Sequence, residues 1–174
     1  MKKNLLLAIA TFSMLASTIA EARSVKAFTL NAQLKKMHID PNSYLAKERF
    51  RAGSIVVDQF TKTITLQLDR KWYCPPGALC SMVMPAPIII KLPLVSVTNG
   101  ACNSLIFEAR RDQRPVDGNL TVLSVVDNSR FNCPSLHPVE PTEVHLETVS
   151  AGMDGHVVKT HSSFTAEKLR PTSF

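Results

Sequence analysis

The chain has 174 residues, a formal net charge of +6 at pH 7 and a hydrophobic content of 45%. A chain of this length suits one domain and can bury a core without depending on many disulfides or a metal. Beyond the amino-terminal segment, the longest stretch without charged or strongly polar residues is 82–90, which is short and contains Pro85 and Pro87. These properties favour a single folded domain and argue against a membrane-spanning helix after the amino-terminal segment.

Residues 1–22 have the pattern of an export signal. Lys2 and Lys3 give a positively charged start, residues 5–19 are mostly apolar, and residues 20–22 form a small-x-small cleavage site. Cleavage there would lower the net charge by one unit, because it removes two lysines and one glutamate. A compact start with two lysines is typical of bacterial secretion, so we expect a periplasmic or secreted protein.

The segment 23–52 shows no single hydrophobic period. Asp40 is a capping residue in front of Pro41, and Gly53 follows Ala52 as a stop signal. This pattern predicts a short helix from Pro41 to Arg51. We expect it to precede a β domain over residues 53–166.

From Gly53 onward, apolar and polar residues alternate with a period of two. Ile55 and Val57 are followed, after a four-residue connection, by Ile64 and Leu66. This connection places Val57 opposite Ile64 and Ile55 opposite Leu66, so both apolar pairs share one face. The alternation therefore predicts a β-hairpin.

Alternating or β-prone stretches continue along the chain and predict an antiparallel meander of about seven strands. In the first of the later stretches, Pro93 and a change of apolar face near Leu94 indicate a bulge or an edge position. The expected fold is all-β, either a sandwich or a small barrel, with a frayed tail at 167–174. The later strands are predicted at 88–98, 104–110, 119–127, 143–150 and 156–164.

The four cysteines fall after the predicted cleavage site. An even number of cysteines in an exported chain favours two disulfides. Cys74 and Cys80 enclose a short, proline-rich loop, whereas Cys102 and Cys133 lie just outside the two ends of a predicted hairpin. We therefore expect a Cys74–Cys80 bridge and a Cys102–Cys133 bridge.

The segment 72–87 contains the single tryptophan, one predicted disulfide and several prolines. A rigid loop that displays apolar side chains loses little entropy on binding, so the segment is a candidate recognition tip. The alternative is that Trp72, Leu79 and Met82 cap an end of the sandwich or barrel. The candidate binding residues are Trp72, Tyr73, Leu79, Met82 and Met84.

The last predicted hairpin places two histidines across from each other. A five-residue loop would set His145 opposite His161 and Glu147 opposite Lys159. Two such histidines could bind zinc or share a proton, but no third ligand is evident. We therefore predict two solvated histidines, and neither a metal site nor a cofactor.

The sequence contains no nucleophile elbow and no zinc-protease helix motif, so we expect no enzymatic activity. Its basic residues are interleaved with acidic ones, and export would separate the protein from cellular nucleic acid. We therefore expect no nucleic-acid partner. The favoured function is an exported, noncatalytic, disulfide-stabilised β domain that binds a protein or an envelope component, with inhibition as one form of binding. Two alternatives are a structural or accessory envelope protein that self-assembles, and a small-ligand carrier if the sheet closes into a barrel. The oligomeric state stays open.

Overall fold

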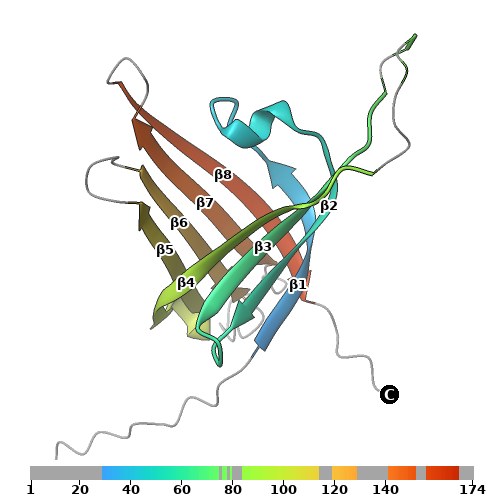
Figure 1. Ribbon diagram of the computed structural model, residues 1–174. Helices are drawn as coiled ribbons and strands as arrows, with labels where there is room; N and C mark the ends of the chain where they lie inside the picture. Colours follow the sequence, from blue (N-terminus) through green and yellow to red (C-terminus); the bar gives the residue numbers. More distant parts are fainter. Residues whose placement is uncertain are drawn as a thin grey trace, which may run out of the picture.

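A computed structural model describes residues 29–74, 76–77, 79, 84–113, 119–128, 141–151 and 156–168. In this part of the chain, eight antiparallel strands form a closed barrel in which sequence neighbours pair and the last strand pairs with the first (Figure 1). The strands are β1 (Thr29–His38), β2 (Phe50–Asp58), β3 (Thr63–Arg70), β4 (Ile88–Asn99), β5 (Leu105–Gln113), β6 (Asn119–Asp127), β7 (Thr142–Ala151) and β8 (Val157–Lys168). The all-β antiparallel prediction is confirmed, and the fold is a barrel rather than a sandwich.

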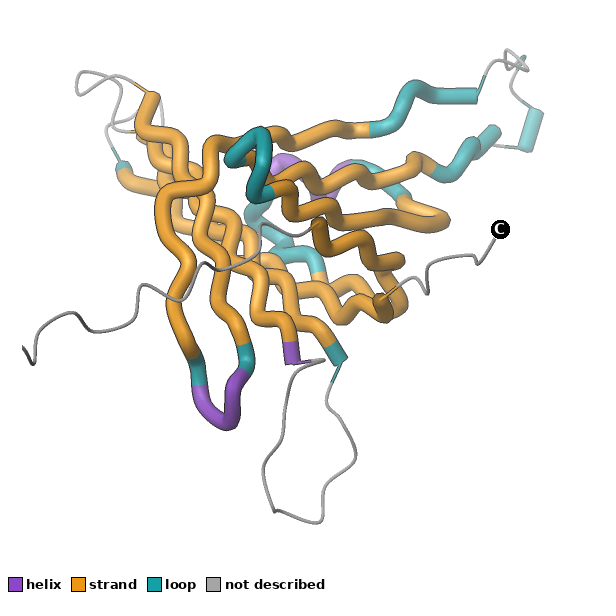
Figure 2. Tube along the Cα trace, turned by 90° about the horizontal axis from the view of Figure 1, so that it is seen from below, coloured by secondary structure: helices purple, strands orange, loops and turns teal. Residues whose placement is uncertain are grey.

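The two ends of the barrel carry different connections. We call the end with the β2–β3 and β4–β5 connections the lower end, and the end with the β1–β2 and β3–β4 connections the upper end (Figure 1). Figure 2 shows the wall from below, with the short 3-10 helix η2 (Ala101–Asn103) between β4 and β5. A second 3-10 helix, η1 (Tyr44–Lys47), lies in the β1–β2 connection.

Alternation of side chains along each strand fills the centre of the barrel. The predicted β2–β3 hairpin register is confirmed, with Val57 opposite Ile64 and Ile55 opposite Leu66. Most of the inward-facing side chains are fully buried, so these side chains fill the interior of the barrel. The inward set includes Leu30, Ala32, Ile55, Val57, Ile64, Leu66, Leu92, Phe107, Ala109, Leu123, Val125, Val144, Leu146 and Phe164.

Of the two possibilities predicted for the stretch 88–98, a bulge or an edge position, the bulge is present in β4. The register between β4 and β5 shifts between Leu94 and Ser96, so one residue of β4 is left over at that point. This extra residue explains the change of apolar face in the sequence, because a bulge moves the following side chains to the opposite face.

The amino-terminal part of the described chain differs from the prediction. Residues 29–38 form β1, a strand that the sequence analysis missed, and the predicted helix from Pro41 to Arg51 is wrong in type and extent. Only η1 is helical there, because Ser43 caps it and β2 already begins at Phe50. The barrel thus includes strand residues on both sides of η1.

The β7–β8 hairpin is offset from its predicted register by two residues. Glu147 lies opposite His161, and His145 lies opposite Ser163. The reason is that β7 and β8 still pair at Ala151 and Val157, so the connection begins one residue later than predicted. The predicted opposition of His145 to His161 and of Glu147 to Lys159 is therefore wrong.

Two of the four cysteines lie in the described part. Neither Cys74 nor Cys102 is a free thiol, whereas Cys80 and Cys133 lie outside the described residues, so the two pairings remain predictions. The proposed export signal at 1–22 also lies outside them. Among the residues that the structure describes, no helix combines the length and the apolar character needed to span a membrane.

Candidate functional site

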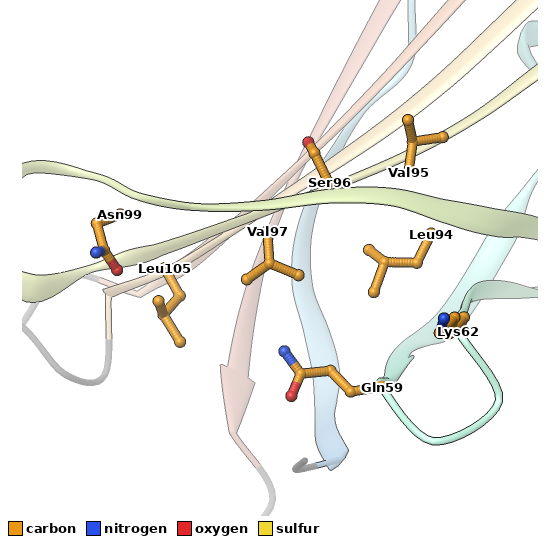
Figure 3. Close-up of a pocket in the computed structure, with 8 residues that line it drawn as sticks. All are labelled: Gln59, Lys62, Leu94, Val95, Ser96, Val97, Asn99 and Leu105. Carbon is orange, nitrogen blue, oxygen red and sulfur yellow. The ribbon is translucent and has the colours of Figure 1, made fainter. Parts of the chain in front are cut away.

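The lower half of β4 forms one wall of a groove. Pairing between β3 and β4 ends at Thr63 and Pro93, whereas pairing between β4 and β5 continues to Asn99 and Leu105. The main-chain N–H of Leu94 still donates to the carbonyl oxygen of Lys62 at 2.9 Å. Below this bond, β4 extends past the β2–β3 turn, and a groove of about 560 Å³ lies between them (Figure 3).

The floor of the groove is apolar. Figure 3 shows Leu94, Val97 and Leu105 extending toward Gln59, while Val95 projects from the other side of β4. Val97 lies opposite the inward-facing Phe107 in the register, yet it is 40% exposed. The wall is incomplete beside Val97 because β3 begins at Thr63 and does not extend this far toward the lower end. An apolar ligand group could therefore displace water from these side chains.

The opposite wall is the polar β2–β3 turn, which contributes Gln59 and Lys62. One carboxylate oxygen of Asp58, Oδ1, accepts hydrogen bonds from the main-chain N–H groups of Phe60 at 2.8 Å and Thr61 at 3.2 Å. Hydrogen bonds from Thr61, through its side chain and then its backbone, lower the pKa of Asp58 from its ordinary value of 3.8. Asp58 is therefore ionised at neutral pH and fixes the turn, while the positive charge of Lys62 lies at the rim of the groove.

The upper end of the barrel is closed by the β1–β2 connection. Leu45 of η1 is 0% exposed and belongs to the hydrophobic core, and the hydroxyl of Ser43 accepts a hydrogen bond from the N–H of Leu45 at 3.2 Å. The N–H of Asp40 donates to Ser162 Oγ at 3.1 Å, and the Asp40 carboxylate accepts from the N–H of His161 at 2.9 Å. The bond from His161 is the main reason why the pKa of Asp40 is lowered. These contacts hold η1 over the upper end as a lid.

The described residues of the predicted recognition tip are exposed and do not belong to the core. Trp72, Tyr73, Leu79 and Met84 are all exposed, Leu79 completely so, and Met82 lies outside the described residues. The guanidinium carbon of Arg49 lies 4.5 Å from the centre of the Tyr73 ring. The alternative interpretation of these residues as a cap therefore does not hold for Leu79, since Leu45 occupies that role.

The structure brings the two predicted histidines together on the outer face of the barrel. The rings of His145 and His161 are stacked with their centres 5.5 Å apart, despite the changed register. His145 Nε2 lies 3.3 Å from Glu143 Oε2, and His161 Nδ1 lies 3.3 Å from Glu147 Oε1. Within the described ranges, no group of three or more histidine, cysteine or acidic side chains is arranged to hold a metal ion.

The groove was not among the sites predicted from the sequence. One usable signal was present: the β-prone stretch 88–98 is clearly longer than the stretch 63–68 with which it pairs, and its apolar face changes near Leu94. A long strand beside a short one leaves part of its edge uncovered. The residues missed in this way are Gln59, Lys62, Leu94, Val95, Ser96, Val97, Asn99 and Leu105.

The fold and the groove define a class of protein: an up-and-down β-barrel with a packed centre and an amphipathic groove at one mouth. Comparison with known proteins adds no closer identity, since no family model matches the chain and no characterised protein or solved structure is significantly similar to it.

Proposed function

We propose that this protein is a noncatalytic binding protein whose ligand occupies the groove at the lower mouth of the barrel. The observation that carries the proposal is the composition of the groove, in which an apolar floor of Leu94, Val97 and Leu105 faces the polar side chains of Gln59 and Lys62. Small binding sites commonly combine apolar walls with a few polar groups that orient the ligand. The ligand therefore has an apolar part and an anionic or hydrogen-bond-accepting part.

The packed interior determines where a ligand is bound. An eight-stranded barrel is wide enough either to be filled by side chains or to enclose one small ligand. Here fully buried side chains such as Leu66, Phe107 and Leu146 fill the centre, and Leu45 closes the upper end. The closed barrel fits the alternative of a small-ligand carrier, and the filled centre supports a ligand site at the mouth of the barrel rather than in an enclosed cavity. The proposal retains export to the periplasm or exterior and the two predicted disulfides.

The test uses anilinonaphthalene sulfonate, a fluorescent dye with an apolar ring system and one negative charge. We expect the dye to bind, and Val97→Asp to weaken binding by at least about tenfold, because a carboxylate on the floor removes apolar contact and repels the sulfonate. The matched control is Ile89→Asp, which adds the same charge to β4 at a side chain that is 58% exposed and lies outside the groove. Equal dye affinity in both folded variants would place the dye elsewhere and contradict the proposal.

A second candidate function is binding of a protein or envelope component through the β3–β4 connection. It is favoured by the exposure of Tyr73, Leu79 and Met84, which all belong to this connection, because large exposed apolar side chains on one segment are candidates for an interaction site.

The two candidates are distinguished by capture from an envelope extract with Leu79→Asp and Val97→Asp side by side. If the connection is the binding site, Leu79→Asp abolishes capture and leaves the melting temperature unchanged, because Leu79 is fully exposed. Loss of the same captured component with Val97→Asp alone would favour the groove instead.

A further inference from the structure

Among the residues that the structure describes, the lower half of β4 has strand pairing on one side only. After the bulge at Val95, residues 96–99 continue the ladder with β5. The ladder with β3 ends at Pro93, and the last main-chain bond that the described residues make on that side runs from Leu94 to Lys62. From this edge we infer that the groove receives the extended carboxyl-terminal segment of a peptide, which adds to β4 as a strand. The inference rests on the proposed function and names the class of ligand.

The chemistry of an open strand edge points to a peptide. Successive residues of a strand direct their N–H and C=O groups alternately to its two sides, so several main-chain groups of residues 95–99 face the groove. A second peptide backbone offers donors and acceptors at the matching spacing, and addition of a strand is a known means of peptide recognition. A hydrocarbon chain would occupy the apolar floor but would leave these main-chain groups without partners.

The register sets the side-chain pattern of the peptide. Val97 faces inward opposite Phe107, and Asn99 faces inward opposite Leu105, whereas Thr98 between them is directed outward. An added strand has the same alternation. Every second side chain of the peptide would therefore face the apolar floor, and apolar residues are expected at those positions.

The direction of the added strand follows from the position it takes. It continues the line of β3, which is antiparallel to β4, so its chain runs from the open lower end toward the β2–β3 turn. The carboxyl end of the peptide then meets this turn, where Lys62 lies at the rim of the groove. Lys62 supplies a positive charge for a free carboxylate. The turn blocks the line of the added strand, so a longer chain could not continue past it in that direction.

The probe is a hexapeptide of alternating threonine and valine, acetylated at its amino end, with either a free acid or an amide at its carboxyl end. We expect the acid to shift the amide resonances of residues 95–99 in a nitrogen–proton NMR titration, and the amide form to bind about threefold more weakly. Lys62→Asn removes this preference while keeping a residue type that tolerates the left-handed backbone found at position 62, where φ is 50°. Lys91→Asn, which changes a lysine on β4 outside the groove, retains the preference.

A second pair of peptides tests the main-chain contact. N-methylation of one alternate set of residues should abolish binding, and N-methylation of the other set should be tolerated, because the two sets face opposite sides of a strand. Equal binding, or loss of binding with both sets, overturns the inference. Dye binding without peptide binding also overturns it and leaves the proposed function intact, whereas absence of both contradicts both proposals. Concentration-dependent shifts at residues 95–99 without peptide would assign the edge to a second copy of the chain and overturn the inference.

Discussion

Gly53 lies on the inner face of β2, close to Leu34 of β1 and to Gln67 and Leu68 of β3. A Cβ atom at this position would lie 2.6 Å from Leu34 Cδ1 and 2.9 Å from the main-chain oxygen of Gln67. The second contact is with backbone that is held in the β2–β3 ladder and cannot move aside without breaking the pairing. Glycine is therefore needed here for close approach, not to end a helix as the sequence analysis predicted.

Replacing Gly53 by alanine tests this role. We expect Gly53→Ala to lower the free energy of unfolding by about 1–3 kcal/mol, because the added methyl group overpacks the wall. Urea denaturation followed by circular dichroism measures the change. Ser54→Ala, on the next residue of β2, is the control and should have little effect. Equal midpoints for Gly53→Ala and wild type would contradict the assignment.

Single residues were predictable only where the local pattern decides their position. The four-residue connection predicted that Val57 lies opposite Ile64, and the register of β2 and β3 confirms this pair. The position of Lys62 beside the groove did not follow, because it depends on how far β4 extends beyond β3. Residue type alone could not reveal that a lysine in a turn faces an uncovered strand edge.

At the scale of elements, the strand that escaped prediction shows how a bulge hides a pattern. Leu30, Ala32 and Leu34 alternate as buried residues of β1, but the register with β8 shifts between Leu34 and Lys36, and the next inward residue is Met37. This break in spacing removes the regular period from the sequence. The amphipathic alternation of β1 was therefore present but too short to be recognised.

The short helix illustrates a different limit. Asp40 followed by Pro41 is a good helix start, but Asp40 instead bonds to the N–H groups of Asn42 and His161. His161 belongs to β8 and is distant in the sequence, so no local rule could include this contact. The connection consequently forms a lid with one 3-10 turn, and Leu45 closes the barrel.

At the scale of the whole molecule, closure depends on one pair of strands. Every other ladder joins strands that follow each other in the chain, whereas β1 must meet β8. Alternation predicts the hairpins, but it contains no information on whether the first strand reaches the last. This is why the sequence left sandwich and barrel as equal possibilities, and why the mouth with its groove could not be predicted.

The same topology predicts how the barrel folds. Local hairpins form before distant strands meet, so the β1–β8 seam should close late. Leu34→Ala, at the seam opposite Ala166, should speed unfolding and change the folding rate by less than about twofold. Leu66→Ala, in the β2–β3 hairpin, should slow folding.

Stopped-flow folding and unfolding rates measured across a range of urea concentrations separate the two cases. Both leucines are buried, at 5% and 0% exposure, so both substitutions should cost about 2–5 kcal/mol and give measurable changes. If Leu34→Ala slowed folding as much as Leu66→Ala, the β1–β8 seam would form early and the expectation would be wrong.

An even number of up-and-down strands also determines where foreign sequence can be attached. Thr29 pairs with Asp58, which directly precedes the turn at the groove, and Lys168 pairs with Ala32 of the same first strand. Both ends of the barrel chain therefore leave at the lower mouth. Foreign sequence joined directly to Thr29 or Lys168 would therefore start at the mouth that holds the groove, whereas a label attached beyond Ala151 of β7 would start at the opposite end.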